Sequence, residues 1–579
     1  MLSNVTACPL DCYDSCGILY ENGKIKPLKI GHTNGFLCPH MNHFKKHALI
    51  QKPRYKGKEI TMQEALILLT KMLSESKPDE ILHYRGSGNF ALMQEVSDHF
   101  FASYGATLTD GNLCDGAGEA GIIEGRGSNK NMPISQIYKS DVVIFWGRNP
   151  HTTSSHLLPL IKDKKIIVID PIKTKIAKMA DIHMQLRPRT DLHLALLFSR
   201  FLHIYNDCDI EYLDEHAPDY EDFYELTQTV RIKAALDEIG VSLGQIGELL
   251  ELVKNKKVAI VCGIGIQKYR DGADIIRAID AFAVMLGLFG KDGSGVSYLG
   301  SSREHIESPF NKKAKLVSKV DTEFSNFKTV FIQGANPLSQ MPDSLRVKKS
   351  ISKTENVVYF GLYENETSEV ADLIIPAKSF LHKEDVRTSY SHNSMMFMNK
   401  VADTEVGISE YDLSAYLCKH FNIAHESEEF YINHFKNCAL KKDDGIWHVK
   451  QREEVPYKDG FDTDDGEFIF LDEFDNNLEI TDTLHLITMK SETSLNSQFN
   501  RKENVYLNTA LGFKEDELVT ITSQTGSVDL KVKINDYLRD DCILIYSGTK
   551  GVNNLTSSKH SYEGKNATYQ QNRVEVTRV

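Results

Sequence analysis

The sequences DVVIFWGRNP (141–150) and TVFIQGANP (329–337) decide the fold of this chain. Each is an apolar strand that leads through a glycine turn into an Asn-Pro pair. Each is followed by a second strand, a variable helix, an Ala-Asp pair and an apolar run that ends at a proline. The spacing from Asn149 to Asn336 nearly equals the spacing from Asp181 to Asp372, so residues 141–188 and 329–376 are nearly in register. We predict a duplicated nucleotide-binding unit and call the two copies the first and the second repeat.

The rest of the chain continues this alternation of strands and helices. Short apolar strands are expected at 141–145, 165–169, 258–262, 329–333 and 356–360, with helical stretches such as 62–73 between strands. This order predicts parallel sheets covered on both faces. After residue 481, apolar and polar residues alternate at period two, which predicts a β-barrel-like domain. The sequence therefore predicts a multi-lobed α/β fold.

Composition excludes several classes of function. The chain has 579 residues, too many for one core, and its 41% hydrophobic and 25% charged residues are ordinary globular values. The net charge of −13 argues against a nucleic-acid or anionic-membrane partner. The longest apolar window, Ala281–Gly290, has about half the length of a membrane span, and no signal peptide is visible. We expect a cytoplasmic protein without a membrane span.

Four of the ten cysteines lie near the N-terminus in the pattern C-x3-C-x3-C-x21-C, at Cys8, Cys12, Cys16 and Cys38. Four thiolates can enclose a 4Fe–4S cluster. Structural zinc prefers paired C-x2–4-C halves, and a radical enzyme that binds adenosylmethionine would need C-x3-C-x2-C. A role as small core residues at helical spacing conflicts with the nearby proline and glycine. The spacing favours an iron–sulfur cluster.

Glycines and polar residues follow the strands of both repeats. Gly147 permits close approach of a phosphate or base, and Asn149 offers an amide. Asp170 ends the next strand, where nucleotide-binding folds place the carboxylate that accepts a ribose hydroxyl. The second repeat and the turn CGIGIQ (262–267) add Gly334, Asn336, Glu364 and Gly263. An aspartate at a strand end is more often a helix N-cap, but together these residues suggest two nucleotides.

The stretch NLCDGAGEAG (112–121) places one cysteine in a run of glycines and alanines. Such a run predicts an exposed turn that enters a helix. From the residues alone, Cys114 could be a nucleophile, a metal ligand or a small apolar filler.

Taken in order, these motifs resemble the molybdopterin oxidoreductase family, the dimethyl sulfoxide reductase superfamily. The similar segments are CPLDCYDSCG, GFLCPHMN, SDVVIFWGRNP, VIDPIKTKIAKMAD, RPRTDLHLAL, GIGIQ, IQGANPLSQMPDS, ADLIIPAKSFLHKEDV, LNSQFN and GVNNLT. The resemblance implies a 4Fe–4S domain at 1–50, a discontinuous α/β pterin-binding domain at 51–118 and 320–440, and an α/β guanine-dinucleotide-binding domain at 119–319. A β-barrel-like molybdopterin dinucleotide-binding domain at 481–579 would follow. Residues 441–480 before it are acidic and turn-rich, as in DDGIW and KDGFDTDDGEF, and are expected to be a connector.

The resemblance also implies a bis-molybdopterin guanine dinucleotide with molybdenum or tungsten. In this family a residue from the loop after the first strand–helix units completes the metal's coordination shell, and Cys114 lies at that place. A thiolate matches the softness of four dithiolene sulfurs, and the neighbouring glycines are expected to let the backbone approach a bulky cofactor. Asp115 is the rival ligand, and a structural thiol is the third interpretation. Asp115, Glu119 and His40 are the local groups able to move protons.

Further cofactor contacts follow from the family motifs. One guanine dinucleotide is expected at Trp146, Gly147, Asn149, Asp170 and Asp191, with Gly263 in a third strand-end turn. The second guanine dinucleotide is expected near Gly334, Asn336, Gln340 and Glu364. Residues of the C-terminal domain are expected to cap the pterins: Ser497, Gln498, Phe499, Asn500 and Asn554. The alternative for each residue is a hydrogen bond that stabilises its loop.

The chain departs from the family pattern in three places. His40 stands where many relatives have a lysine between cluster and pterin, with Lys45 and Lys46 further along. Arg189 replaces the glycine of the family's RPGTD and could pair with a phosphate. Asp115 follows Cys114 where formate dehydrogenases usually have histidine, which lowers formate oxidation among the expected activities.

We expect an oxidoreductase that performs a two-electron reaction on a small substrate, with an S- or N-oxide or a sulfur compound favoured over formate or nitrate. The cluster would exchange electrons with a redox partner such as a ferredoxin-like carrier. The alternatives are a non-redox hydratase, in which the metal only activates water, and an electron-transfer subunit that has lost its cofactor.

Overall fold

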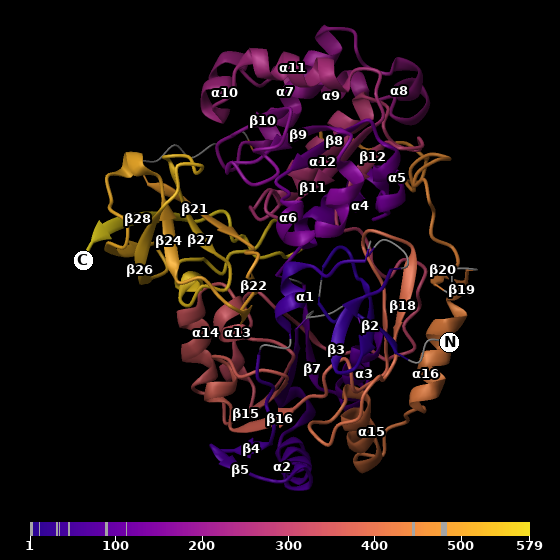
Figure 1. The fold of residues 1–579 in the computed structure, drawn as a ribbon, viewed down its shortest axis with the longest axis vertical. Coiled ribbons are helices and arrows are strands. Elements are labelled where there is room, and N and C mark those ends of the chain that lie inside the picture. The colour runs from indigo at the N-terminus through magenta and orange to yellow at the C-terminus, as the bar shows by residue number, and fades with distance from the viewer. Residues whose placement is uncertain are drawn as a thin grey trace.

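Residues 4–10, 12–29, 33, 35–44, 47–86, 91–111, 113–442, 446–475 and 483–579 are described in a computed structural model of the chain. Two α/β lobes lie one above the other, and a barrel lies beside them (Figure 1). The parallel sheets and the closed barrel confirm the predicted multi-lobed α/β fold. None of the helices in the described part of the chain has the length and apolarity that crossing a bilayer requires.

The upper lobe is built on a five-stranded sheet, all of whose neighbours are parallel, in the order β10-β9-β8-β11-β12. Its strands are β8 (Val142–Trp146), β9 (Lys165–Ile169), β10 (Ile182–Met184), β11 (Val258–Cys262) and β12 (Gly295–Ser297). Every residue of β8 and β11 is buried, as expected for central strands with helices on both faces.

The helices of this lobe are α4 (Gly116–Arg126), α5 (Ile134–Lys139), α6 (Pro150–Thr153), α7 (Asp191–Ile204), α8 (Ile210–His216), α9 (Tyr220–Gln228), α10 (Ile232–Ile239), α11 (Leu243–Val253) and α12 (Gly272–Met285). Helices α8 to α11 gather at the end of the molecule away from the lower lobe (Figure 1).

The lower lobe holds an eight-stranded sheet in the order β13-β7-β6-β14-β15-β16-β4-β5, parallel from β13 to β16 and antiparallel at β4 and β5. Its strands are β4 (Arg54–Tyr55), β5 (Lys58–Glu59), β6 (Ile81–Arg85), β7 (Thr107–Asp110), β13 (Leu316–Ser318), β14 (Thr329–Gln333), β15 (Asn356–Gly361) and β16 (Leu373–Pro376). The chain therefore leaves this sheet after β7 and returns to it at β13.

The helices around this sheet are α2 (Met62–Ser74), α3 (Val96–Tyr104), α13 (Pro337–Gln340), α14 (Ser344–Ile351) and α15 (Glu410–His420). Helix α2 begins where the sequence predicts a helix, because Thr61 and Glu64 form a reciprocal capping box that satisfies two N–H groups of the first turn.

The two repeats share the same backbone connections. In each, the glycine after the first strand donates its N–H to a carbonyl at the end of the second strand, over 2.8 Å at both Gly147 and Gly334. The aspartate before the third strand accepts an N–H of the second strand, over 2.9 Å at both Asp181 and Asp372. The recurring Ala-Asp pair thus ties the third strand to the second, which is why it occurs in both copies.

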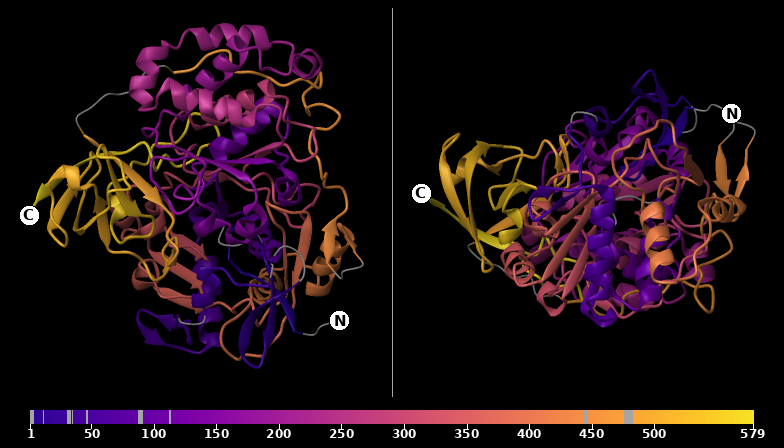
Figure 2. Two further views of the ribbon diagram at one scale, coloured as in Figure 1. Left: turned by 45° about the horizontal axis from the view of Figure 1, so that its top comes forward. Right: turned by 90° about the horizontal axis from the view of Figure 1, so that it is seen from below.

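The C-terminal region closes into a barrel. Its strands are β21 (Leu484–Met489), β24 (Asn504–Leu507), β25 (Leu518–Thr522), β26 (Ser527–Ile534), β27 (Cys542–Tyr546) and β28 (Arg573–Arg578), and β22 (Ser494–Leu495) pairs with β23 (Gln498–Phe499) beside it. In β25 only Val519 and Ile521 are buried, so the period-two pattern separates the interior from the surface. Figure 2 shows the barrel at one side of both lobes.

The N-terminal segment forms a small antiparallel sheet of β1 (Val5–Ala7), β2 (Gly17–Glu21) and β3 (Lys24–Pro27), followed by α1 (Pro39–His43). The hairpin turn between β2 and β3 lies at Asn22 and Gly23, both with positive φ. A four-stranded sheet of β17 (Asp385–Arg387), β18 (Ser394–Met398), β20 (Trp447–Val449) and β19 (Ala439–Lys441) lies near α16 (Glu428–Asn437).

The predicted connector at 441–480 contributes to the interior. Aromatic residues interrupt its acidic runs, and apolar rings of this size favour burial. Four of them are buried in the core of the upper lobe: Tyr457, Phe461, Phe468 and Phe470. Residues 443–445 and 476–480 of this segment lie outside the described residues. The domain boundaries themselves stay predictions.

Candidate active site

A cavity of about 550 Å³ lies where both lobes, the barrel and the N-terminal segment meet. Four glycines that directly follow parallel strands line it: Gly147 and Gly263 in the upper sheet, and Gly86 and Gly334 in the lower sheet. In open α/β sheets, ligands bind outside the carboxyl ends of the strands. The two sheets therefore present their ligand-binding edges to one shared cavity, whose size is within the range of small-molecule and cofactor pockets.

Neighbouring strand ends pack so tightly that only glycine fits. A Cβ on Gly263 would lie 1.8 Å from the carbonyl oxygen of Gly147, and a Cβ on Gly86 would lie 2.4 Å from that of Gly334. By contrast, a Cβ on Gly334 would meet nothing within 4 Å, so this turn faces open space. Gly334 also has a φ of +55°, which favours glycine.

Nine of the predicted cofactor contacts line the cavity: Gly147, Asn149, Asp170, Asp191, Gly263, Gly334, Gln340, Ser497 and Gln498. The Oδ1 atom of Asn149 is buried and has no hydrogen-bond partner among the described residues, so it can accept a bond from a ligand. Burial raises the pKa of Asp170 to about 7 and that of Asp191 to about 6. A bound hydroxyl or amide donor would stabilise either carboxylate in its ionised form.

Six predicted contacts do not line the cavity: Trp146, Asn336, Glu364, Phe499, Asn500 and Asn554. Trp146 is completely buried, and its Nε1 donates to Asp191 Oδ1 over 2.7 Å, so it orients a residue that does face the cavity. Asn336 Nδ2 donates to Glu366 and, over 3.0 Å, to Ser497 Oγ, which joins the second repeat to the segment beside the barrel.

The other four of these residues have their own partners or surroundings. Glu364 pairs with Arg54 at the surface, Phe499 packs against Phe44 and His47, and Asn500 is exposed. Asn554 Oδ1 accepts from Ser344 Oγ over 2.7 Å. Their roles toward a cofactor stay predictions. Arg189 lies 4.0 Å from Asp271 and is not among the lining residues.

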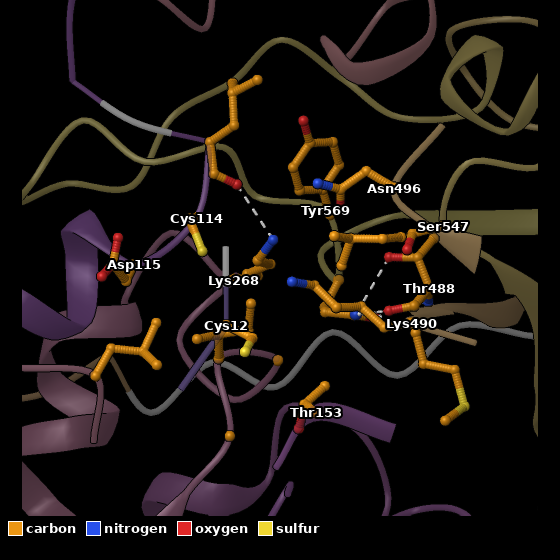
Figure 3. A pocket seen from close by; sticks show the side chains of 18 of the residues that line it. Cys12, Cys114, Asp115, Thr153, Lys268, Thr488, Lys490, Asn496, Ser547 and Tyr569 are labelled. Carbon is orange, nitrogen blue, oxygen red and sulfur yellow. Dashed lines mark hydrogen bonds between the residues drawn. The ribbon is translucent and has the colours of Figure 1, made fainter. Parts of the chain in front are cut away.

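Cys114 lies in the cavity wall, in the loop that enters α4 (Figure 3). Asp115 is the N-cap residue of α4, so the predicted turn into a helix is confirmed. The prediction that this turn is exposed was wrong, because Asp115 and the first turn of α4 are buried against neighbouring segments. Gln267, which is completely buried, donates from Nε2 to the carbonyl oxygen of Cys114 over 2.7 Å and accepts from the Gly118 N–H over 3.1 Å. This side chain fixes the loop that carries Cys114.

The glycines after Cys114 have a packing function that differs from the predicted approach to a cofactor. A Cβ on Gly118 would lie 2.5 Å from the Tyr298 hydroxyl, and one on Gly121 would lie 2.3 Å from the carbonyl oxygen of Ala273 in α12. Helix α4 therefore lies against α12 at a distance that only glycine permits.

Positively charged side chains also line the cavity: Arg148, Lys268, Arg303, Lys319 and Lys490. Lys268 Nζ donates to the Leu113 carbonyl over 3.2 Å and lies 4.6 Å from the centre of the Tyr569 ring, beside Cys114 (Figure 3). Burial lowers the pKa of Lys268 and of Lys319 to about 8. An anionic ligand would lower the cost of burying these charges.

The four N-terminal cysteines line one small cavity, of about 30 Å³. None of the ten cysteines forms a disulfide. Burial raises the pKa of all four thiols, to about 12 for Cys12, so deprotonation requires a metal or a nearby cation. Cys12 and His40 also line the large cavity, so they lie in the wall between the two cavities. His40 Nε2 lies 2.9 Å from the carbonyl oxygen of Ser491, and burial lowers its pKa.

The side chains around these thiols include a second histidine. His156 Nδ1 lies 2.9 Å from Asp14 Oδ2 and 3.5 Å from Cys16 Sγ. Lys45 and Lys46, the lysines that follow His40 further along the chain, lie outside the described residues.

Residues 50–407 match the family model described as Molybdopterin oxidoreductase, and residues 481–573 match the model described as Molydopterin dinucleotide binding domain. The chain belongs to the molybdopterin oxidoreductase family. The resemblance inferred from the motifs is thus confirmed.

Relatives of this family align with part of the chain. The "Probable oxidoreductase YyaE" of Bacillus subtilis is 27% identical over 443 residues, which are 69% of this chain and 66% of that protein. "Formate dehydrogenase H" of Escherichia coli is 24% identical, over 69% of this chain and 65% of that protein. The chain thus spans slightly less than two thirds of these relatives. The structure of "Acetylene Hydratase from Pelobacter acetylenicus" has the same fold, with a TM-score of 0.77, 14% identity and 100% coverage of both chains.

Several cavity residues in this member of the family were not predicted from the sequence: Gly86, Arg148, Lys268 and Lys490. Gln267, which holds the Cys114 loop from outside the cavity lining, was not predicted either. Gln267 and Lys268 adjoin or end the turn CGIGIQ, and Arg148 lies within WGRNP, so the motifs marked the correct loops. The sequence around Gly86 would also have allowed its prediction, because this glycine directly follows a short strand, as Gly147 and Gly334 do.

Proposed function

We propose that this chain is a molybdenum or tungsten enzyme that carries a bis-molybdopterin guanine dinucleotide and a 4Fe–4S cluster. One observation carries the proposal: glycine turns from both repeats open on one cavity that has Cys114 in its wall, and a four-cysteine cavity shares the wall at Cys12. Two repeats would bind two nucleotides, and four converging thiols would bind one cluster.

The side chains fit these groups. The open space at Gly334 and the unpartnered oxygen of Asn149 suit a guanine dinucleotide in each repeat. The cations Lys319 and Lys490 suit its phosphates. Cys114 supplies a soft thiolate for the metal. When bound, the metal supplies two-electron chemistry and the cluster one-electron transfer.

The protein's own groups would orient the substrate and move protons beside Cys114. Lys268 can donate a hydrogen bond to an oxygen or sulfur atom of the substrate, and it lies in the same wall as Cys114. Asp115 and Glu119 also line the cavity and can accept or return a proton. His40 bonds through Nε2 to the Ser491 carbonyl oxygen over 2.9 Å, so its other ring nitrogen is the one able to take part in a hydrogen bond beside the two cavities.

The substrate is proposed to be a small S- or N-oxide or a sulfur compound, in preference to formate or nitrate. Asp115 after Cys114, in place of the histidine usual in formate dehydrogenases, supports the lower rank of formate, and Lys268 can donate a hydrogen bond to an oxide oxygen. Electrons would pass through the cluster to or from a carrier such as a ferredoxin-like protein, in the cytoplasm.

The test starts with anaerobically purified protein. Molybdenum, tungsten, iron and pterin are measured, and formate, nitrate, S- and N-oxides, thiosulfate and polysulfide are screened with a viologen dye. Cys114→Ala should abolish turnover, whereas Cys208→Ala, which removes a half-buried thiol elsewhere in the same lobe, should retain it. Turnover that does not depend on any electron donor or acceptor would indicate a hydratase. Iron without molybdenum or tungsten would indicate an electron-transfer subunit.

A further inference from the structure

The turn WGRNP places an arginine in the interior, between the two cavities. Arg148 is 5% exposed and lines the large cavity. Its Nε and Nη2 atoms lie 3.4 Å and 3.2 Å from Ser154 Oγ, which are long hydrogen bonds to a neutral hydroxyl. Among the described residues, no carboxylate forms an ion pair with it within 4 Å. A buried guanidinium without a paired carboxylate is costly unless another negative charge lies close by.

The ionisable groups that surround Arg148 belong to the cysteine segment and to β11. Its Cζ atom lies 4.8 Å from the centre of the Tyr13 ring. Burial lowers the pKa of Arg148, and Tyr13, Asp14, Cys12 and Cys262 oppose that effect. Asp14 Oδ2 lies 2.9 Å from His156 Nδ1, and Asp14 Oδ1 has no hydrogen-bond partner among the described residues. Of the groups near Arg148, Cys12 is the one that would gain a negative charge on binding a cluster, because the thiol would become a thiolate ligand.

We propose that Arg148 is a positioning residue that raises the reduction potential of the cluster held by the four N-terminal cysteines. The inference rests on the proposed function, because it requires that these thiolates carry a 4Fe–4S cluster. Reduction adds one electron and one negative charge to the cluster without making or breaking a covalent bond. A fixed positive charge over the ring of Tyr13, the residue next to Cys12, stabilises the reduced form more than the oxidised form. Arginine stays charged even when buried.

The position of Arg148 also determines where this effect acts. Cys12 lies in the wall shared by the two cavities, and Arg148 lines the larger one. A higher potential at the cluster would favour electron transfer from the metal in the large cavity to the cluster.

The experiment measures the midpoint potential of the cluster in the full-length holoenzyme, by electron paramagnetic resonance during titration with dithionite. Arg148→Gln should shift the one-electron equilibrium at least tenfold toward the oxidised cluster, which is 59 mV to lower potential. Arg148→Lys, which keeps the charge, should remain near the wild-type value. Arg277→Gln is the matched control, because Arg277 is also buried but bonds to Phe470 in the upper-lobe core. Its potential should equal that of the wild type.

Iron content decides the remaining outcomes. Loss of iron in Arg148→Gln, with full iron in Arg148→Lys and Arg277→Gln, would support the need for a positive charge beside the cluster. An unchanged potential in an iron-replete Arg148→Gln variant, or loss of iron in Arg148→Lys as well, would overturn the inference. A wild-type protein without four irons per chain would instead refute the cluster in the proposed function.

Discussion

Gly121→Ala tests whether the packing of α4 against α12 holds the Cys114 loop in place. The added Cβ would lie 2.3 Å from the Ala273 carbonyl oxygen, where an ordinary contact needs at least 3.4 Å, so α4 must move by about 1 Å. Helix α4 begins at Gly116, two residues after Cys114, and a shift of the helix therefore moves the proposed metal ligand.

Two energies compete in this variant. Alanine in a helix interior is favoured over glycine by about 1 kcal/mol, whereas overpacking a close contact costs about 1–3 kcal/mol. The net loss of stability should be at most about 2 kcal/mol, so the protein should fold. A misplacement of about 1 Å at a reacting group lowers the rate by roughly 10²-fold, so activity should fall far more than stability.

The assay compares kcat/KM, metal content and melting temperature with those of Gly247→Ala. Gly247 lies in the interior of α11, and a Cβ there would meet nothing within 4 Å. Gly247→Ala should keep full activity and melt at the wild-type temperature or slightly above it. Wild-type kcat/KM in Gly121→Ala would show that the contact between α4 and α12 does not position Cys114.

Three further perturbations address the loop, the core and the barrel. Gln267→Leu removes the 2.7 Å donor to the Cys114 carbonyl and should lower turnover while the metal content stays near that of the wild type, and wild-type turnover would contradict its positioning role. Asp280→Asn leaves the Arg126 guanidinium, which is 1% exposed, without its carboxylate partner. The free energy of unfolding should fall by about 3–5 kcal/mol, which lowers the melting temperature. A wild-type melting temperature would contradict this expectation. Burial lowers the pKa of His485 from its ordinary 6.5 to about 3. Between pH 6.5 and about pH 3, the unfolded chain therefore binds a proton that the folded barrel does not bind. The barrel loses stability as the pH falls through this range. His485→Gln should flatten that part of the melting-temperature curve against pH, and an unchanged curve would show that His485 does not contribute.

The sequence predicted the strands and their order well because the signal is local. The central strands β8, β11 and β14 are completely buried, so each contains a continuous apolar run, and a glycine follows each strand. The four clustered cysteines were equally evident from spacing, and the structure brings them to one cavity.

The direction of a polar side chain at a strand end was not predictable. Asn149 and Asn336 occupy equivalent turns, yet only Asn149 lines the cavity, because Asn336 bonds to Glu366 and to Ser497. Both partners of Asn336 come from segments outside its own strand and turn. A sequence pattern alone does not show which of these bonds forms.

Residues that act across long sequence distances were also beyond prediction. Gln267 holds Cys114 from 153 positions away, and Gly86 lies against Gly334 across the middle of the lower sheet. The proposed effect of Arg148 on the cluster depends on its proximity to the cysteine segment, which only the folded chain brings about. These contacts depend on how the lobes meet, which local patterns do not encode.

The most direct test of the account is X-ray absorption at the metal edge of the purified enzyme, compared between wild type and Cys114→Ala. The account predicts molybdenum or tungsten in both proteins and one sulfur ligand fewer in the variant. The same number of sulfur ligands in both, or neither metal in the wild type, would contradict it.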